Sequence, residues 1–221
     1  MDLIKKTVKD GRKTLSEYES RLVIESAGVF VAAAALTKTK EEAIQEAEKM
    51  GYPVVLKGCS AELSHKTEAG MVALNINSPE EVALVFEELT AKMKNLDGIL
   101  VEKMVRGSRE FVIGLSRDPS FGPCVMFGLG GIFTEALKDV TFRIAPLSME
   151  DALEMIDEIK TKKLLGEFRG SPAVDRNALA RALVGVGDLG IKYDSIAEID
   201  INPLIICGDK PVAVDALVVL K

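Results

Sequence analysis

The chain has 221 residues, with 28 Lys and Arg against 34 Asp and Glu, a formal net charge of −6 and no tryptophan. This acidic balance argues against a dedicated nucleic-acid binder, which needs basic side chains for phosphates and aromatic rings for bases. Cys59, Cys124 and Cys207 are far apart and form no CxxC pair, so we expect no zinc site, no disulfide framework and a reducing, cytoplasmic setting. No apolar run reaches the roughly 18 residues of a membrane span, so no membrane association is expected.

The first part of the chain predicts a small lobe of mixed helices and strands. Residues 1–13 are rich in basic side chains, and we expect them to form a solvated N-terminal extension. Capping boxes at Ser16, Thr39 and Ser78 then predict helices near 16–27, 40–50 and 79–93. Apolar and β-branched runs predict strands near 29–33, 53–59 and 71–76. The turn Leu96-Asp97-Gly98 is expected to end this lobe, which gives it the range 14–97.

The remainder, 98–221, predicts a second and larger lobe. Apolar runs separated by turns at Asp118-Pro119 and Phe121-Gly122-Pro123 are typical of an antiparallel meander. Its strands are expected near 99–104, 109–117, 123–127, 196–201 and 211–220. Ser148 with Asp151 opens one helix, and another covers roughly 175–186. The fold class is therefore α+β (or α/β) with two lobes.

The single histidine, His65, lies in a polar loop between the strands 53–59 and 71–76. Lys57 stands on the strand before that loop. Neutral imidazole is nucleophilic near neutral pH without special activation, and an ammonium group suits phosphate oxygens. The pairing suggests phosphoryl transfer through a phosphohistidine. A solvated loop histidine with no chemical role is the alternative.

Acidic and amide side chains in the second lobe suggest a metal site. Glu198, Asp200 and Asn202 alternate along one strand and therefore share a face. Asn202 and Asp215 would meet if the last two strands pair as a hairpin. An amide oxygen and a carboxylate beside phosphates are typical magnesium ligands, although a turn-forming Asn-Pro with a solvated Asp explains the same pattern. Glu102, inside an apolar strand, belongs at a sheet edge or in a ligand cleft.

Six segments in order carry a resemblance to a known family. They are Gly-Tyr-Pro-Val-Val-Leu-Lys (51–57), Leu-Ser-His-Lys-Thr-Glu-Ala-Gly (63–70), Asp-Pro-Ser-Phe-Gly-Pro (118–123), Phe-Gly-Leu-Gly-Gly-Ile (127–132), Asp-Val-Thr-Phe-Arg-Ile-Ala-Pro-Leu (139–147) and Glu-Ile-Asp-Ile-Asn-Pro-Leu (198–204). The chain resembles the β subunits of ADP-forming acetyl-CoA synthetases, which are ATP-grasp proteins of the succinyl-CoA synthetase superfamily. Met71 departs from the family, which usually has a second glycine after Gly70.

The resemblance implies an ATP-grasp fold of two lobes with the nucleotide cleft between them. It implies that Lys57 contacts the phosphates of ATP or ADP and that Glu102 lies beside the adenine and ribose. Val101 to Met104 would contact the base through their backbone. Further residues follow from matching segments: Glu110 and Arg143 for phosphate or nucleotide, Asn202 and Asp215 for Mg²⁺, and His65 as the phosphohistidine.

The implied reaction is acyl-CoA + ADP + phosphate ⇌ acid + CoA + ATP. The chain carries no CoA-binding module, so the resemblance also implies an α subunit with CoA-binding and ligase domains, in an α2β2 heterotetramer. Two alternatives remain open at this point. One is a free-standing ATP-grasp ligase that makes an acyl phosphate, and the other is a non-catalytic nucleotide-binding subunit.

Overall fold

The computed structural model describes residues 2–62, 69–131, 139–168 and 170–221. The chain forms two compact units. The larger unit comprises residues 1–15, 19–31 and 105–221, and the smaller unit comprises residues 16–18 and 32–104. Within the described ranges, no helix is both long enough and apolar enough to cross a membrane.

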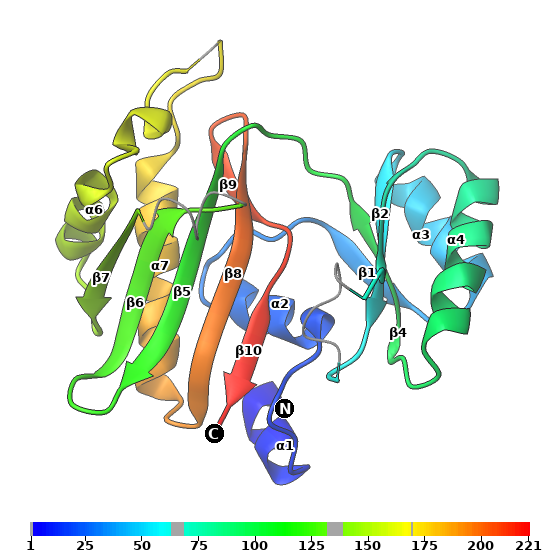
Figure 1. The fold of residues 1–221 in the computed structure, drawn as a ribbon, viewed down its shortest axis with the longest axis horizontal. Helices are drawn as coiled ribbons and strands as arrows, with labels where there is room; N and C mark the ends of the chain where they lie inside the picture. The colour runs from blue at the N-terminus through cyan, green and yellow to red at the C-terminus, as the bar shows by residue number, and fades with distance from the viewer. Residues whose placement is uncertain (1, 63–68, 132–138, 169) are drawn as a thin grey trace. The chain divides into compact units, whose positions relative to one another are not determined.

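The smaller unit is a sheet with two helices on one face (Figure 1). The strands are β1 (Ala34–Thr37), β2 (Val54–Cys59), β3 (Val72–Ile76) and β4 (Gly98–Lys103), antiparallel in the order β1-β4-β2-β3. The helices are α3 (Lys40–Met50) and α4 (Pro79–Lys92). Alternate strand residues such as Leu56 and Val101 point into a core shared with these helices, because successive side chains of a strand face opposite ways. The residues between them must therefore point to the other face.

The predicted helix starts of this unit are confirmed. Thr39 and Glu42 form both halves of a capping box at the start of α3. The Ser78 side chain accepts a hydrogen bond from the Glu81 amide, while the Glu81 carboxylate accepts from the amide of Asn77. These caps satisfy amide groups that the first turn of a helix leaves without an intrahelical partner.

The larger unit is built on a six-stranded antiparallel sheet in the order β10-β8-β5-β6-β7, with β9 paired to β8. Its strands are β5 (Glu110–Asp118), β6 (Gly122–Leu129), β7 (Val140–Ile144), β8 (Ile196–Cys207), β9 (Lys210–Ala213) and β10 (Leu217–Leu220). The helices are α1 (Leu3–Lys9), α2 (Glu17–Ser26, which starts in the smaller unit), α6 (Met149–Glu158), α7 (Arg176–Lys192) and the short 3-10 helix η1 (Lys162–Leu165). In Figure 1, α6 and α7 lie against one face of this sheet.

The core of the larger unit lies between the sheet and these helices. Phe111 of β5 and Phe127 of β6 are fully buried there, and their rings stack with centroids 5.5 Å apart. Val125 of β6 and Leu183 of α7 belong to the same cluster. The opposite face of the sheet therefore carries the alternate strand residues, among them Asp200.

Several sequence predictions differ from the structure. The sequence predicts a solvated extension over residues 1–13. This prediction is wrong for Leu3–Lys9, which form α1 and bury Ile4 and Thr7. The strand predicted near 29–33 is β1 at 34–37, and Val31 forms only an isolated bridge with Ala213. The strand predicted for 211–220 divides into β9 and β10.

The boundary between the units also differs from the predicted one. The sequence places it at 97/98, whereas the structure has it after Met104. The reason is that β4 pairs with both β1 and β2 and so forms an inner strand of the smaller sheet. The turn Leu96-Asp97-Gly98 therefore joins α4 to β4 and does not separate the units.

Candidate functional site

Lys57 carries a buried positive charge in the smaller unit. It lies on β2, where its neighbour Leu56 points to the helices, so its side chain points to the opposite face. The ammonium group donates to Oε1 of Glu17 at 2.9 Å and to Oε2 of Glu102 at 3.1 Å. All three side chains are almost completely buried, with 7%, 1% and 2% of their surface exposed. A charge this deeply buried is tolerated because the opposite charges are in direct contact.

The structure brings two of the predicted residues, Lys57 and Glu102, into contact. It also adds Glu17, which sequence reasoning missed. Glu17 is the first residue of α2 and belongs to the short segment 16–18 of the smaller unit. The sequence contained only a helix-start signal there, and an acid in the first turn of a helix is explained by the helix dipole alone.

Val101 lies inside β4, whereas Met104 follows its last residue. Val101 is opposite Ala35 on one side and Leu56 on the other, so its backbone groups are engaged in the sheet. Met104 follows the end of β4, and its amide donates to the carbonyl of Pro53 at 3.3 Å. The backbone at Val101 and the amide of Met104 therefore both have partners within the smaller unit.

In the larger unit, β8 carries a bulge at the predicted metal residue Asn202. The pairing of β5 with β8 shifts register between Ile201 and Leu204, where β8 has one residue more than β5. Such bulges are frequent beside active sites because they redirect one side chain relative to its neighbours. Before the bulge, Asp200 and Glu198 share one face of the sheet, opposite Gly114 and Ser116 of β5.

The β8–β9 hairpin connects the segments that carry Asn202 and Asp215. Leu204 is paired with Ala213, and the amide of Val214 donates to the carbonyl of Pro203 at 3.3 Å. The expected pairing of these segments is confirmed, although Asp215 follows the last paired residue, Ala213, and lies in the connection between β9 and β10 and not inside a strand. The proximity of Asn202 to Asp215 stays a prediction.

Negative charge accumulates at this point. Burial, followed by the nearby carboxylates of Glu198 and Asp215, raises the pKa of Asp200 to about 6. A divalent cation would relieve this repulsion, and the oxygen donors of Asn202 and Asp215 suit Mg²⁺. In the described part of the chain, no group of three or more His, Cys, Asp or Glu side chains is arranged to hold a metal.

Glu110 is the first residue of β5, beside a glycine turn. Its carboxylate lies so close to Gly131 that a Cβ there would be 2.4 Å from Oε2. Both residues line a pocket of about 440 Å³ within the larger unit. The absence of a side chain at Gly131, which has φ +69°, leaves room for the Glu110 carboxylate.

Arg143 is placed away from these groups. On β7 it pairs with Val125, which points into the helix-covered core, so Arg143 is on that side of the sheet. Its guanidinium binds Glu158 of α6 with contacts of 2.6 and 3.0 Å. The hydrogen bond to Glu158 raises the pKa of Arg143. Asp200 lies on the other face of this sheet, away from α6 and α7.

The family follows from whole-chain comparisons. A family model described as an ATP-grasp domain matches residues 6–220. The chain is 41% identical over 225 residues to the β subunit of acetate–CoA ligase [ADP-forming] I of Pyrococcus furiosus, which covers 99% of this chain and 97% of that relative. The chain belongs to the ATP-grasp family, in the group of β subunits of ADP-forming acetate–CoA ligases. The ATP-grasp fold and the family indicated by the motifs are thereby confirmed.

Two further relatives are similar to this ATP-grasp chain over almost its whole length. Acetate–CoA ligase [ADP-forming] I of Archaeoglobus fulgidus is 37% identical over 224 residues, which is 99% of this chain but 33% of the longer relative. The solved dinucleotide forming acetyl-coenzyme A synthetase 1 of Ca. Korarchaeum cryptofilum has a TM-score of 0.88 and 43% identity, covering 100% of this chain and 99% of that one. That structure is in complex with coenzyme A and Mg-AMPPCP, and its phosphohistidine segment points towards the nucleotide binding site.

His65, the predicted phosphoryl carrier, lies in residues 63–68, outside the described residues. The structure does describe the strands that flank this range in the ATP-grasp chain. Lys57 lies on β2, which leads into it, and Met71 precedes β3, which follows it. Met71 is 2% exposed, and its Cε would be 2.3 Å from a Cβ at Gly58. Met71 thus fills space that only a glycine at position 58 leaves open.

Proposed function

We propose that this chain is the nucleotide-binding subunit of an ADP-forming acyl-CoA synthetase, with His65 as its phosphoryl carrier. The proposal depends chiefly on the buried ammonium of Lys57, which stands on the strand leading into the segment of the only histidine. The Korarchaeum relative, whose phosphohistidine segment points towards its nucleotide site, supports the same role here.

The proposed chemistry is a transfer of one phosphoryl group in two displacements. The neutral imidazole of His65 attacks the phosphorus of a phosphohistidine on the partner chain, and the partner's imidazole leaves. A terminal oxygen of ADP then displaces His65, which gives ATP and restores the free imidazole. Charge develops on the equatorial oxygens of the transferring group, and the Lys57 ammonium would stabilise it. Mg²⁺, held by Asn202 and Asp215, would neutralise nucleotide phosphate charge.

The remaining chemistry of acyl-CoA synthesis would belong to an α-type partner. The Pyrococcus relative is a separate β subunit, whereas the Archaeoglobus relative is about three times as long as the matched region. This chain would assemble with an α subunit that binds CoA and acid, in an α2β2 arrangement. Turnover of acyl-CoA is then expected only in the presence of that partner.

The test is labelling of the purified chain with [γ-³²P]ATP and Mg²⁺. The expected product is an acid-labile, base-stable label that is absent from His65→Asn, because no other histidine exists in the chain. ADP binding measured by calorimetry should be retained in His65→Asn, which separates a carrier from a binding residue. Equal labelling of both proteins would contradict the proposal.

A further inference from the structure

The ammonium of Lys57 is held by two carboxylates of different origin. Glu102 reaches it from the adjacent strand, where the sheet fixes its place opposite Val55 and Ala34. Glu17 reaches it from the first turn of α2, with Oε1 2.9 Å from Nζ and only 1% of its side chain exposed. The sheet alone would place Glu102 beside Lys57, but it does not place Glu17.

The segment that carries Glu17 is unusual in the chain. Residues 16–18 belong to the smaller unit, whereas residues 1–15 and 19–31 on either side belong to the larger unit. This segment contacts β2. Glu17 binds Lys57, and the thiol of Cys59, two residues further along β2, contacts the side chain of Ser16 and the backbone of Tyr18. The segment is thus fixed to the strand that carries Lys57.

We propose that Glu17 is a positioning residue for Lys57, which holds the ammonium in place for the phosphates of a nucleoside diphosphate. This inference rests on the proposed role of Lys57 in nucleotide binding. A lysine has a flexible four-carbon stem, and a group whose place is fixed before binding loses less freedom when the ligand arrives. Electrostatic stabilisation by an enzyme depends on charges that are preorganised in this way.

An opposing effect has to be weighed. The carboxylate of Glu17 also repels an incoming phosphate, so its removal would make the site more positive. Against this, the ammonium is buried, and a buried charge that loses a direct partner becomes costly and turns towards whatever partner remains. Among the described residues, Glu102 on the neighbouring strand is a carboxylate that stays in contact with the ammonium. The contact distance and the burial therefore favour positioning over repulsion, and removal of Glu17 should weaken ADP binding.

The test is a double-mutant cycle on MgADP affinity, measured by calorimetry on the full chain. Glu17→Gln should raise the Kd for MgADP about tenfold, the scale of one charge-assisted hydrogen bond. Glu17→Asp, which keeps the charge, should recover part of this loss. In a Lys57→Met background, Glu17→Gln should have no further effect, because the two residues act as a unit.

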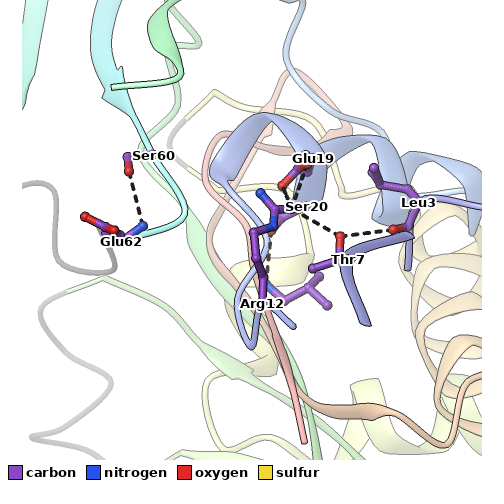
Figure 2. A network of polar contacts seen from close by, with 8 residues as sticks. Leu3, Thr7, Arg12, Glu19, Ser20, Ser60 and Glu62 are labelled. Atoms are coloured by element: carbon purple, nitrogen blue, oxygen red, sulfur yellow. Dashed lines mark hydrogen bonds and ion pairs between the residues drawn. The ribbon is translucent and has the colours of Figure 1, made fainter. Parts of the chain in front are cut away.

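A matched control is available two residues along α2. Glu19 forms an ion pair with Arg12 at 2.7 Å, drawn in Figure 2. Glu19→Gln removes a carboxylate of the same helix without touching Lys57, so the Kd for MgADP should stay within about twofold of wild type. Thermal unfolding of each variant verifies that it is folded. If Glu17→Gln does not fold, Glu17→Asp takes its place in the cycle, where the shortened side chain should still weaken ADP binding.

The outcomes separate the two proposals. Unchanged ADP affinity in Lys57→Met would overturn the proposed role of Lys57 itself. If Lys57→Met weakens ADP binding while Glu17→Gln leaves it unchanged or makes it tighter, only the positioning role is overturned. An equal loss on Glu17→Gln in the wild-type and Lys57→Met backgrounds would also overturn it, since the effect would then be structural and independent of the lysine.

Discussion

In the smaller unit, the buried ammonium of Lys57 is in contact with two carboxylates, whereas in the larger unit Asp200 faces the carboxylates of Glu198 and Asp215. In the first arrangement, opposite charges are in direct contact within the protein. In the second, burial and then the nearby carboxylates raise the pKa of Asp200 to about 6, because both disfavour the ionised form. The comparison indicates that the smaller unit holds its ammonium group in place by direct ion pairs. In the larger unit, the mutual repulsion of the carboxylates would be relieved by a bound cation.

A second pair of acids, both in the larger unit, shows that donors decide the direction of a pKa shift. Burial acts to raise the pKa of Asp139, as it does for Asp200, but hydrogen bonds from the Thr161 side chain and the amides of Lys160 and Thr161 lower it overall. Asp139 is therefore a structural acid that joins β7 to the segment before η1. For Asp200, burial and the neighbouring carboxylates instead favour the protonated form.

The largest effect is expected from Asp215→Ala. Loss of this carboxylate should remove the magnesium requirement of histidine labelling and lower its rate about a hundredfold or more, the scale of one lost electrostatic contact in a transition state. The measurement is the initial labelling rate from [γ-³²P]ATP over a range of Mg²⁺ concentrations. Glu154→Gln, an exposed acid on α6, is the control and should label at the wild-type rate. A wild-type magnesium profile in Asp215→Ala would remove Asp215 from the metal site.

Lys57→Met is expected to weaken MgADP by tens of fold. Methionine keeps the length and apolar stem of the side chain but not the charge, so the variant tests the phosphate contact directly. It also leaves Glu17 and Glu102 without the ammonium between them, which should lower the free energy of unfolding by about 3 kcal/mol at neutral pH, since breaking a buried pair exposes its cost. Calorimetry with ADP and with adenosine separates the effects, because adenosine has no phosphate and should bind both proteins alike.

Asp139→Asn should destabilise the chain by about 2 kcal/mol at neutral pH, because the new amide group would face donors that the carboxylate accepted. The wild-type contribution has a defined pH dependence. A carboxyl group with a lowered pKa stabilises the fold fully above its unfolded-state pKa of about 3.9, and loses this contribution as pH falls through the folded-state value. Urea unfolding at pH 7 and below pH 4 should show the difference between wild type and variant shrinking.

A control keeps the Asp139 prediction specific. Asp157 on α6 is paired with Arg176, but more than half of its side chain is exposed. Asp157→Asn should therefore cost less than about 1 kcal/mol. If both variants lost the same stability, the hydrogen bonds around Asp139 would not be the cause.

Local signals in the sequence were sufficient for much of the fold. The helix starts at Thr39 and Ser78 depend on side chains within a few residues of each other, and both are found as predicted. The pairing of the last segments of the chain was also accessible, because they are neighbours along the sequence. In contrast, β7 was missed, since Phe142 and Ile144 on it are half exposed and give no buried-strand pattern.

Long-range contacts account for what the sequence did not reveal. Glu17 contacts a lysine 40 residues away, and no spacing rule links them. The sequence predicts a strand near 29–33, whereas the structure has it at 34–37. An apolar run shows which residues prefer burial but not which of them pair with β4. Arg143 was assigned by its segment alone, and only the pairing of β7 with β6 reveals which side of the sheet it takes.

The smallest effect is expected from Arg143→Met, which tests the two faces of the larger sheet against each other. Arg143 binds Glu158, whose side chain is half exposed, so the pair should contribute less than about 1 kcal/mol to stability. Because Arg143 lies on the helix-covered side and Asp200 on the other, the Kd for MgADP should change less than about twofold. Calorimetry under the conditions used for Lys57→Met provides the direct comparison. A loss of ADP affinity as large as that of Lys57→Met would mean that Arg143 leaves Glu158 for the nucleotide, and would return it to the phosphate-binding set that its sequence segment implies.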